Sequence, residues 1–142
     1  MNRLAEIRAT VARWFLIYLW LHLPLIGVVG YLLDSAIILP MAIASICIVA
    51  TTATWWRAKG AATTRYMAAV ALIAMPSLLV FQFAGHPWQI DMHMYFFAAL
   101  AMLAAFCDWR VMLLATTTIA VHHLALNFLL PMAVFPAGGD FF

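Results

Sequence analysis

The chain has 142 residues, of which 68% are hydrophobic and only 8% are charged, and its formal net charge is +2. Soluble domains are usually about half apolar and about a quarter charged, so this composition excludes a water-facing globular surface. It predicts an all-α integral membrane helical bundle. The two cysteines are too few for a disulfide framework, and we expect both to be free thiols.

Five apolar segments are candidates for transmembrane helices, because a bilayer core of about 30 Å needs about 20 apolar residues in a helix. The predicted spans are residues 14–33, 36–56, 66–85, 90–106 and 111–130. Residues 1–13 are predicted to be a separate cytoplasmic amphipathic segment, which either lies on the inner leaflet or frays. Residues 14–142 then form one transmembrane domain.

The basic residues give the orientation of the predicted bundle. All seven lie before the first span, between the second and third spans, or between the fourth and fifth spans. The positive-inside rule therefore places the N-terminus in the cytoplasm and the C-terminal tail outside. Five spans leave two alternatives: a complete five-helix protein, or a fragment whose sixth helix would return to the cytoplasm.

Histidines gather in the outer half of the predicted bundle. His86, His93, His122 and His123 lie there, and His22 lies near the middle of the first span. Ionisable side chains inside spans are costly and are functional candidates for that reason. Because about four residues connect the fourth and fifth spans, these helices must be antiparallel neighbours. We predict that His93 converges with His123, or with His122, between them.

Imidazole nitrogen binds iron, copper and zinc, and two histidines on facing helices could hold a haem. The sequence therefore predicts a site for haem b or for a copper ion. Thioether sulfur suits copper(I) as well. The candidate ligands are His93, His122, His123, Met92 and Met94.

Three polar neighbours are expected to orient the ligand imidazoles through their second ring nitrogens. Asp91 and Tyr95 share a face of the helix that bears His93, and Asn127 lies one turn after His123. Interhelical hydrogen bonding alone is an alternative role for the histidines, since polar side chains often join membrane helices. A proton path is another alternative, and packing is the alternative role of the two methionines.

Two segments carry a family resemblance: "GHPWQIDMHMYFFAALAMLAAFCDWR", residues 85–110, and "VHHLALNFLLPMAVFPAGGD", residues 121–140. From about residue 65 to 142, the chain resembles the membrane-embedded N-terminal region of some bacterial methyl-accepting chemotaxis proteins. The resemblance implies the bacterial inner membrane, and it implies a further helix that leads to cytoplasmic signalling domains. It implies no ligand.

The sequence holds no catalytic motif and no basic patch for nucleic acid, so we expect neither an enzyme nor a nucleic-acid-binding protein. We expect the transmembrane sensory input domain of a chemotaxis-type signal transducer, embedded in the lipid bilayer as a homo-oligomer. The alternative is a small haem-binding or redox membrane anchor that resembles a b-type cytochrome.

Overall fold

The computed structural model describes residues 3–131, which fold into five α-helices and a short 3-10 segment, η1. The elements are α1 (Arg3–Leu32), α2 (Ile38–Arg57), α3 (Ala62–Gln82), α4 (Gln89–Leu103), η1 (Ala104–Phe106) and α5 (Trp109–Leu129). All five helices, with η1 counted as the end of α4, are long and apolar enough to cross a membrane. The predicted all-helical fold with five such helices is confirmed.

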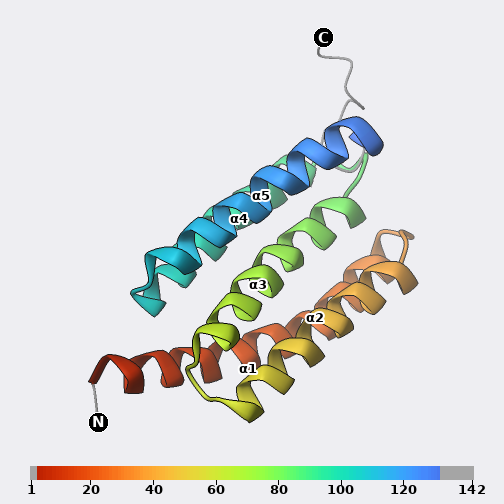
Figure 1. The fold of residues 1–142 in the computed structure, drawn as a ribbon. Coiled ribbons are helices and arrows are strands. Elements are labelled where there is room, and N and C mark those ends of the chain that lie inside the picture. Colours follow the sequence, from red (N-terminus) through yellow and green to blue (C-terminus); the bar gives the residue numbers. More distant parts are fainter. Residues whose placement is uncertain (1–2, 132–142) are drawn as a thin grey trace.

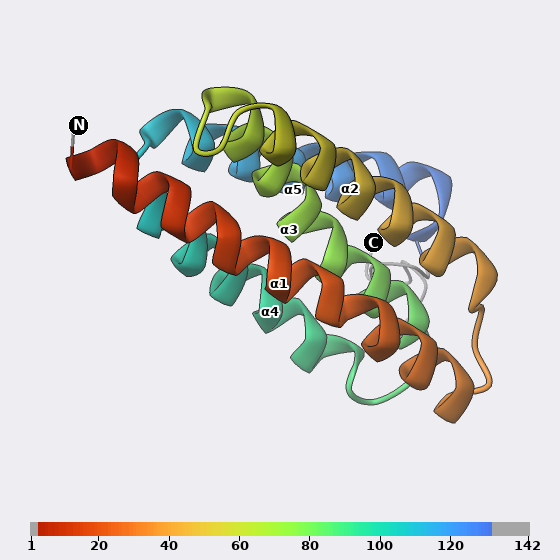
Figure 2. The ribbon, with the colours of Figure 1, turned by 90° about the horizontal axis from the view of Figure 1, so that it is seen from below.

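Helix α3 lies at the centre of the bundle, between the α1–α2 pair and the α4–α5 pair (Figures 1 and 2). It contacts all four other helices, and most of its residues are buried. Alanines such as Ala68, Ala69 and Ala71 lie in the core. Small side chains let membrane helices approach closely, so this composition suits the central position.

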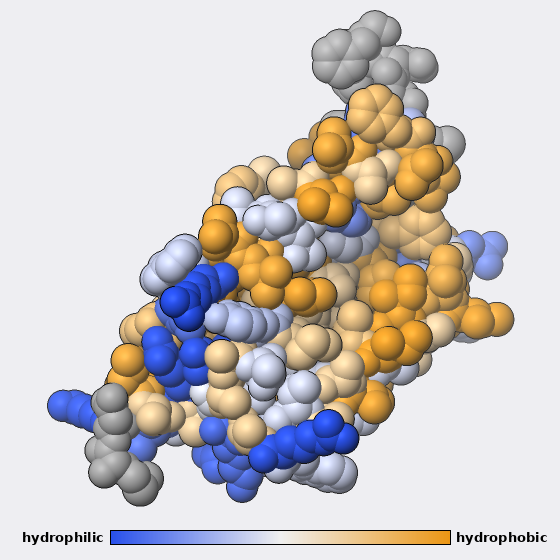
Figure 3. All heavy atoms as spheres, in the orientation of Figure 1, coloured by the Kyte–Doolittle hydropathy of each residue, from blue (hydrophilic) through white to orange (hydrophobic). Residues whose placement is uncertain are grey.

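The bundle has two chemically different ends. The N-terminus, the α2–α3 connection and the α4–α5 connection lie together at one end, with the basic residues on or near them, and we call this the basic end. In Figure 3 hydrophilic atoms gather at this end, near the N-terminus, while apolar atoms cover much of the remaining face. The opposite end, formed by the α1–α2 and α3–α4 connections, is called the distal end.

Asp108 joins three helices at the basic end. Its Oδ2 accepts hydrogen bonds from Nε and Nη2 of Arg65, at 3.0 and 2.8 Å, and lies 4.0 Å from Nη2 of Arg8. Its Oδ1 accepts the backbone N–H of Arg110 and so caps α5. Burial alone would raise the pKa of Asp108, but these hydrogen bonds and the charges of Arg65 and Arg8 hold the pKa below its ordinary value.

The N-terminal segment differs from the prediction. Helix α1 is continuous from Arg3, so residues 3–13 are its first turns and not a separate segment. At 1.5 Å per residue its 30 residues span about 45 Å, longer than a bilayer core. Arg8 donates to the carbonyls of Phe106 and Cys107, at 3.0 and 2.8 Å, which holds this segment against the α4–α5 connection.

The other predicted span boundaries lie within a few residues of the observed helix ends. The third helix shows the largest of these differences, since it covers Ala62–Gln82 rather than residues 66–85. Two glycines with positive φ, Gly60 at 74° and Gly85 at 78°, mark the connections on its two sides. Nearly all of the exterior tail predicted after residue 130 lies outside the described residues, and so does the sixth helix of the fragment alternative.

Candidate functional site

Three histidines meet between α4 and α5 in the distal half of the bundle, and we call them the imidazole cluster: His93, His122 and His123. The ring centroids of His93 and His123 lie 5.9 Å apart, and those of His122 and His123 lie 5.3 Å apart. The ring of Phe96 lies among them, 5.4 Å from His123, 6.0 Å from His122 and 6.3 Å from His93. The structure therefore brings His93 and His123 together between these helices, as the sequence predicted.

Two of the three imidazoles are held by carbonyls of their own helices. Nδ1 of His93 lies 2.8 Å from the carbonyl oxygen of Gln89, and Nδ1 of His123 lies 2.9 Å from that of Ile119. Because a carbonyl oxygen only accepts, Nδ1 must carry the proton in both rings. In the neutral form of each ring, Nε2 then keeps its lone pair. This is the tautomer that a metal-ligating imidazole adopts when a backbone carbonyl orients it.

The three side chains expected to orient these imidazoles do not do so. Backbone carbonyls one turn earlier take that place, because they lie within direct reach of Nδ1 in a helix. Asp91 and Asn127 are exposed. Tyr95 bonds to α1 instead, on another side of α4. Asp91 is an exposed carboxylate in the first turn of α4, where it interacts favourably with the helix dipole. This interaction accounts for its position without a role at the imidazoles.

The predicted cofactors fit this packing unequally. A haem held by His93 and His123 would need space that is filled by the ring of Phe96, which is 5% exposed, so the packing does not fit a haem. Met92 packs against the hydrophobic core and Met94 is 58% exposed, so neither supports the predicted thioether ligation. A copper ion would depend on the imidazole nitrogens. Within residues 3–131, no group of three or more His, Cys, Asp or Glu side chains is arranged for a metal ion.

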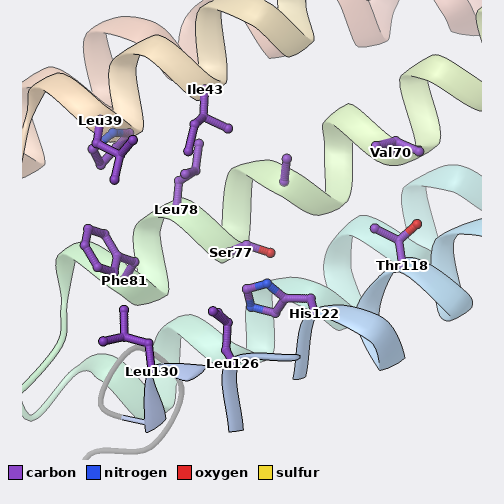
Figure 4. Close-up of a pocket in the computed structure, with 12 residues that line it drawn as sticks. Leu39, Ile43, Val70, Ser77, Leu78, Phe81, Thr118, His122, Leu126 and Leu130 are labelled. Atoms are coloured by element: carbon purple, nitrogen blue, oxygen red, sulfur yellow. The ribbon is translucent and has the colours of Figure 1, made fainter. Parts of the chain in front are cut away.

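His122 lines an open cavity of about 370 Å³ between α2, α3 and α5, and its ring points from α5 toward Ser77 of α3 (Figure 4). We call this cavity the lateral groove. Its lining is mostly aliphatic, and it includes Ile43, Leu78 and Leu126.

Two hydroxyl groups of the lateral groove are already engaged. Ser77 donates to the carbonyl of Ile73 at 2.9 Å, and Thr118 donates to that of Leu114 at 2.8 Å. His122 forms no hydrogen bond within the described part of the chain, so its ring nitrogens are open to a molecule that enters the groove.

Sequence reasoning missed a second polar network, between α1 and α4, which lie alongside each other in Figure 2. Nδ1 of His22 donates to the carbonyl of Tyr18 at 2.8 Å, so Nε2 accepts from the hydroxyl of Tyr95 at 2.5 Å. The Tyr95 oxygen accepts in turn from the hydroxyl of Tyr18. The signal available in the sequence was the spacing of Tyr18 and His22, which puts both on one face of a helix.

The chain matches no protein-family model, no curated protein and no solved structure. Function must therefore be argued from the site. The imidazole cluster offers the ring nitrogens of three half-buried side chains between apolar helices. Such groups can accept a hydrogen bond, bind a cation that prefers nitrogen ligands, or take up a proton.

Proposed function

We propose that this chain is the transmembrane sensory input domain of a chemotaxis-type signal transducer in the bacterial inner membrane. The observation that carries the proposal is the imidazole cluster beside the lateral groove, in the distal half of the bundle. Placing three ionisable, half-buried side chains among apolar helices in a membrane costs free energy that packing alone does not require. The basic end is cytoplasmic under this proposal, in line with the positive-inside rule.

The lateral groove favours a small lipophilic stimulus that carries one polar group. Its apolar walls would hold the hydrocarbon part, and His122 would pair with the polar group. A copper ion on the Nε2 atoms of His93 and His123 is the second candidate occupant, because both rings have the tautomer that leaves Nε2 unprotonated. A haem-binding anchor has less support, since the ring of Phe96 lies where a haem between His93 and His123 would need space.

Helix α5 is the element that would transmit occupancy of the site. It carries two members of the imidazole cluster, and its first turn is capped by Asp108. Asp108 is bonded to Arg65 of α3, so the basic end of α5 is fixed to the central helix. A molecule that separates α5 from α3 at the lateral groove would therefore tilt α5 about this fixed point. Cytoplasmic signalling domains in a homo-oligomer would read that tilt.

A receptor chimera tests this function. The full chain is joined, through a sixth transmembrane helix taken from a methyl-accepting chemotaxis protein, to the cytoplasmic signalling region of that protein. Kinase activity is measured with and without copper(I), in cells without other receptors. If copper is the stimulus, wild-type output should respond to it, and His93→Ala and His123→Ala should each remove that response. Asn127→Ala is the matched control, because this exposed residue lies one turn from His123.

A lipophilic stimulus gives a different pattern in the same assay. Copper would then have no effect, while His122→Ala would change kinase activity, because it removes the side chain that pairs with the polar group of a molecule in the lateral groove. Equal kinase output from wild type and from all three histidine variants, with or without copper, would refute the proposed sensory site.

The proposed orientation has its own test. In a background without Cys47 and Cys107, single cysteines at Asp34 and His86 should react with an impermeant maleimide added outside intact cells. A cysteine at Lys59 should react only after lysis. A cysteine at Gly138, which lies outside the described residues, is expected to react from outside too. Protection of Asp34 or His86 in intact cells would contradict the orientation.

A further inference from the structure

A second cavity, of about 440 Å³, lies at the distal end between the α1–α2 and α3–α4 connections. We call it the distal cavity, and it is separate from the imidazole cluster and the lateral groove. Its lining is largely polar. The lining residues are Leu33, Asp34, Ser35, Gln82, Ala84, Gly85 and His86.

Two buried oxygen atoms of the distal cavity have no hydrogen-bond partner within residues 3–131: Oγ of Ser35 and Oε1 of Gln82. Buried polar atoms are nearly always paired, so two orphans in the lining of one cavity point to an occupant. Gln82 is only 3% exposed, which makes an unpaired amide oxygen costly there.

The amide orientation of Gln82 is fixed by its donors. Nε2 donates to the carbonyl oxygens of Ile26 and Ala36, at 3.0 and 3.1 Å. A flipped amide would place Oε1 against two acceptors, so the unpaired oxygen belongs where the structure has it. Gly30 permits this approach, because a Cβ there would lie 2.7 Å from Nε2 of Gln82. The acceptor is therefore held in place by α1.

The remaining lining defines the charge of the ligand. Asp34 adds a carboxylate at the rim, where it is exposed, and no lysine or arginine lines the distal cavity. His86 accepts the backbone N–H of Trp88 at Nδ1, at 3.1 Å, so its Nε2 carries a proton. Acceptor oxygens thus predominate around the cavity. The complementary ligand is a cation with several N–H donors.

We infer that the distal cavity binds an ammonium group, carried either by a small soluble amine or by the headgroup of phosphatidylethanolamine. A primary alkylammonium group has three N–H donors, which match Gln82 Oε1, Ser35 Oγ and the Asp34 carboxylate. A metal ion matches less well, because no group of three or more His, Cys, Asp or Glu side chains is arranged for one within residues 3–131. The binding residues are separate from those of the proposed sensory site, so an experiment can refute ammonium binding without refuting the sensory function, and the reverse.

Calorimetry on the full chain in nanodiscs tests the inference, with ethylammonium as the probe and phosphatidylglycerol as the amine-free lipid. We expect saturable binding by the wild type. Gln82→Leu should weaken it about tenfold or more, since hydrogen bonds to charged groups are the strong ones. Ser35→Ala and Asp34→Asn should each weaken it about threefold. These two variants can still test the inference if Gln82→Leu fails to fold.

Two controls and a change of lipid complete the experiment. Asp91→Asn removes another exposed carboxylate near the distal end that does not line the cavity, so its binding should equal wild type. His123→Ala should also leave binding unchanged.

If the natural source is the lipid headgroup, adding phosphatidylethanolamine to the nanodiscs should suppress ethylammonium binding. If the source is soluble, the lipid should have no effect. Absence of saturable binding in phosphatidylglycerol, or equal binding by wild type and the three cavity variants, would overturn the inference.

Discussion

Replacing Tyr95 by phenylalanine should destabilise the bundle by breaking two interhelical hydrogen bonds at once. The hydroxyl of Tyr95 donates to Nε2 of His22 and accepts from the hydroxyl of Tyr18. His22 is only 3% exposed, so water cannot easily replace the lost donor. Interhelical hydrogen bonds in membranes average about 0.6 kcal/mol and reach about 1.7. The expected loss is therefore about 1 to 3 kcal/mol of unfolding free energy.

A double-mutant cycle measures the part that belongs to the Tyr95–His22 pair. Unfolding in mixed micelles is compared for wild type, Tyr95→Phe, His22→Phe and the double variant, and Tyr31→Phe serves as the control because Tyr31 is 78% exposed. The cost of Tyr95→Phe should fall by about 0.5 to 1.5 kcal/mol in the His22→Phe background. An unchanged cost in that background would mean that the two side chains do not interact, and the described network would be wrong.

Three further predictions concern other parts of the molecule. Gly30→Ala should lower the free energy of unfolding by about 1–3 kcal/mol, because its Cβ would meet two side-chain atoms at 2.7 Å. Gly27→Ala is the control and should be neutral or stabilising, since the nearest atom to its Cβ is 3.9 Å away. Chemical unfolding compares the two variants. Asp108→Asn should cost about 1–2 kcal/mol at pH 7. Because the folded pKa of Asp108 is lowered, its contribution is present above the ordinary value of 3.8 and lost as pH falls through the folded pKa; an unfolding series from pH 7 to pH 2 should show this step in wild type only. His93→Ala and His123→Ala should each abolish any copper binding, measured by metal analysis of the purified protein. If no copper is bound, each substitution should lower the free energy of unfolding by only about 1 kcal/mol.

The proximity of His93 and His123 could be predicted because it depends on the length of the α4–α5 connection and on residue position along each helix, and both can be read from the sequence. The short connection "CDWR" forces α4 and α5 to be neighbours. The fixed rise of a helix then converts residue number into depth, which places the two rings within about one helical turn of each other. Helix number and approximate ends could be predicted for the same reason, since hydropathy and length determine them.

The faces of the helices could not be predicted in this way. In a membrane protein, residues that face lipid and residues that face other helices are equally apolar, so hydropathy does not tell which side of a helix is packed. Tyr95 was expected beside His93, but two positions along a helix correspond to about 200° of rotation, and it faces α1. Gln82 was overlooked because its role depends on Gly30 of a different helix.

Helix α4 couples the two polar networks of the bundle. His93 contacts α5, and Tyr95, about 200° around the helix, is bonded to His22 of α1. A rotation of α4 that moved His93 away from α5 would therefore also disturb the pairing with His22. Helix α1 continues from His22 to Arg8, which binds the α4–α5 connection at the basic end. If the chain is a sensor, a stimulus in the distal half has two routes to the basic end, one along α5 and one along α1, and both end at the segment that contains Asp108.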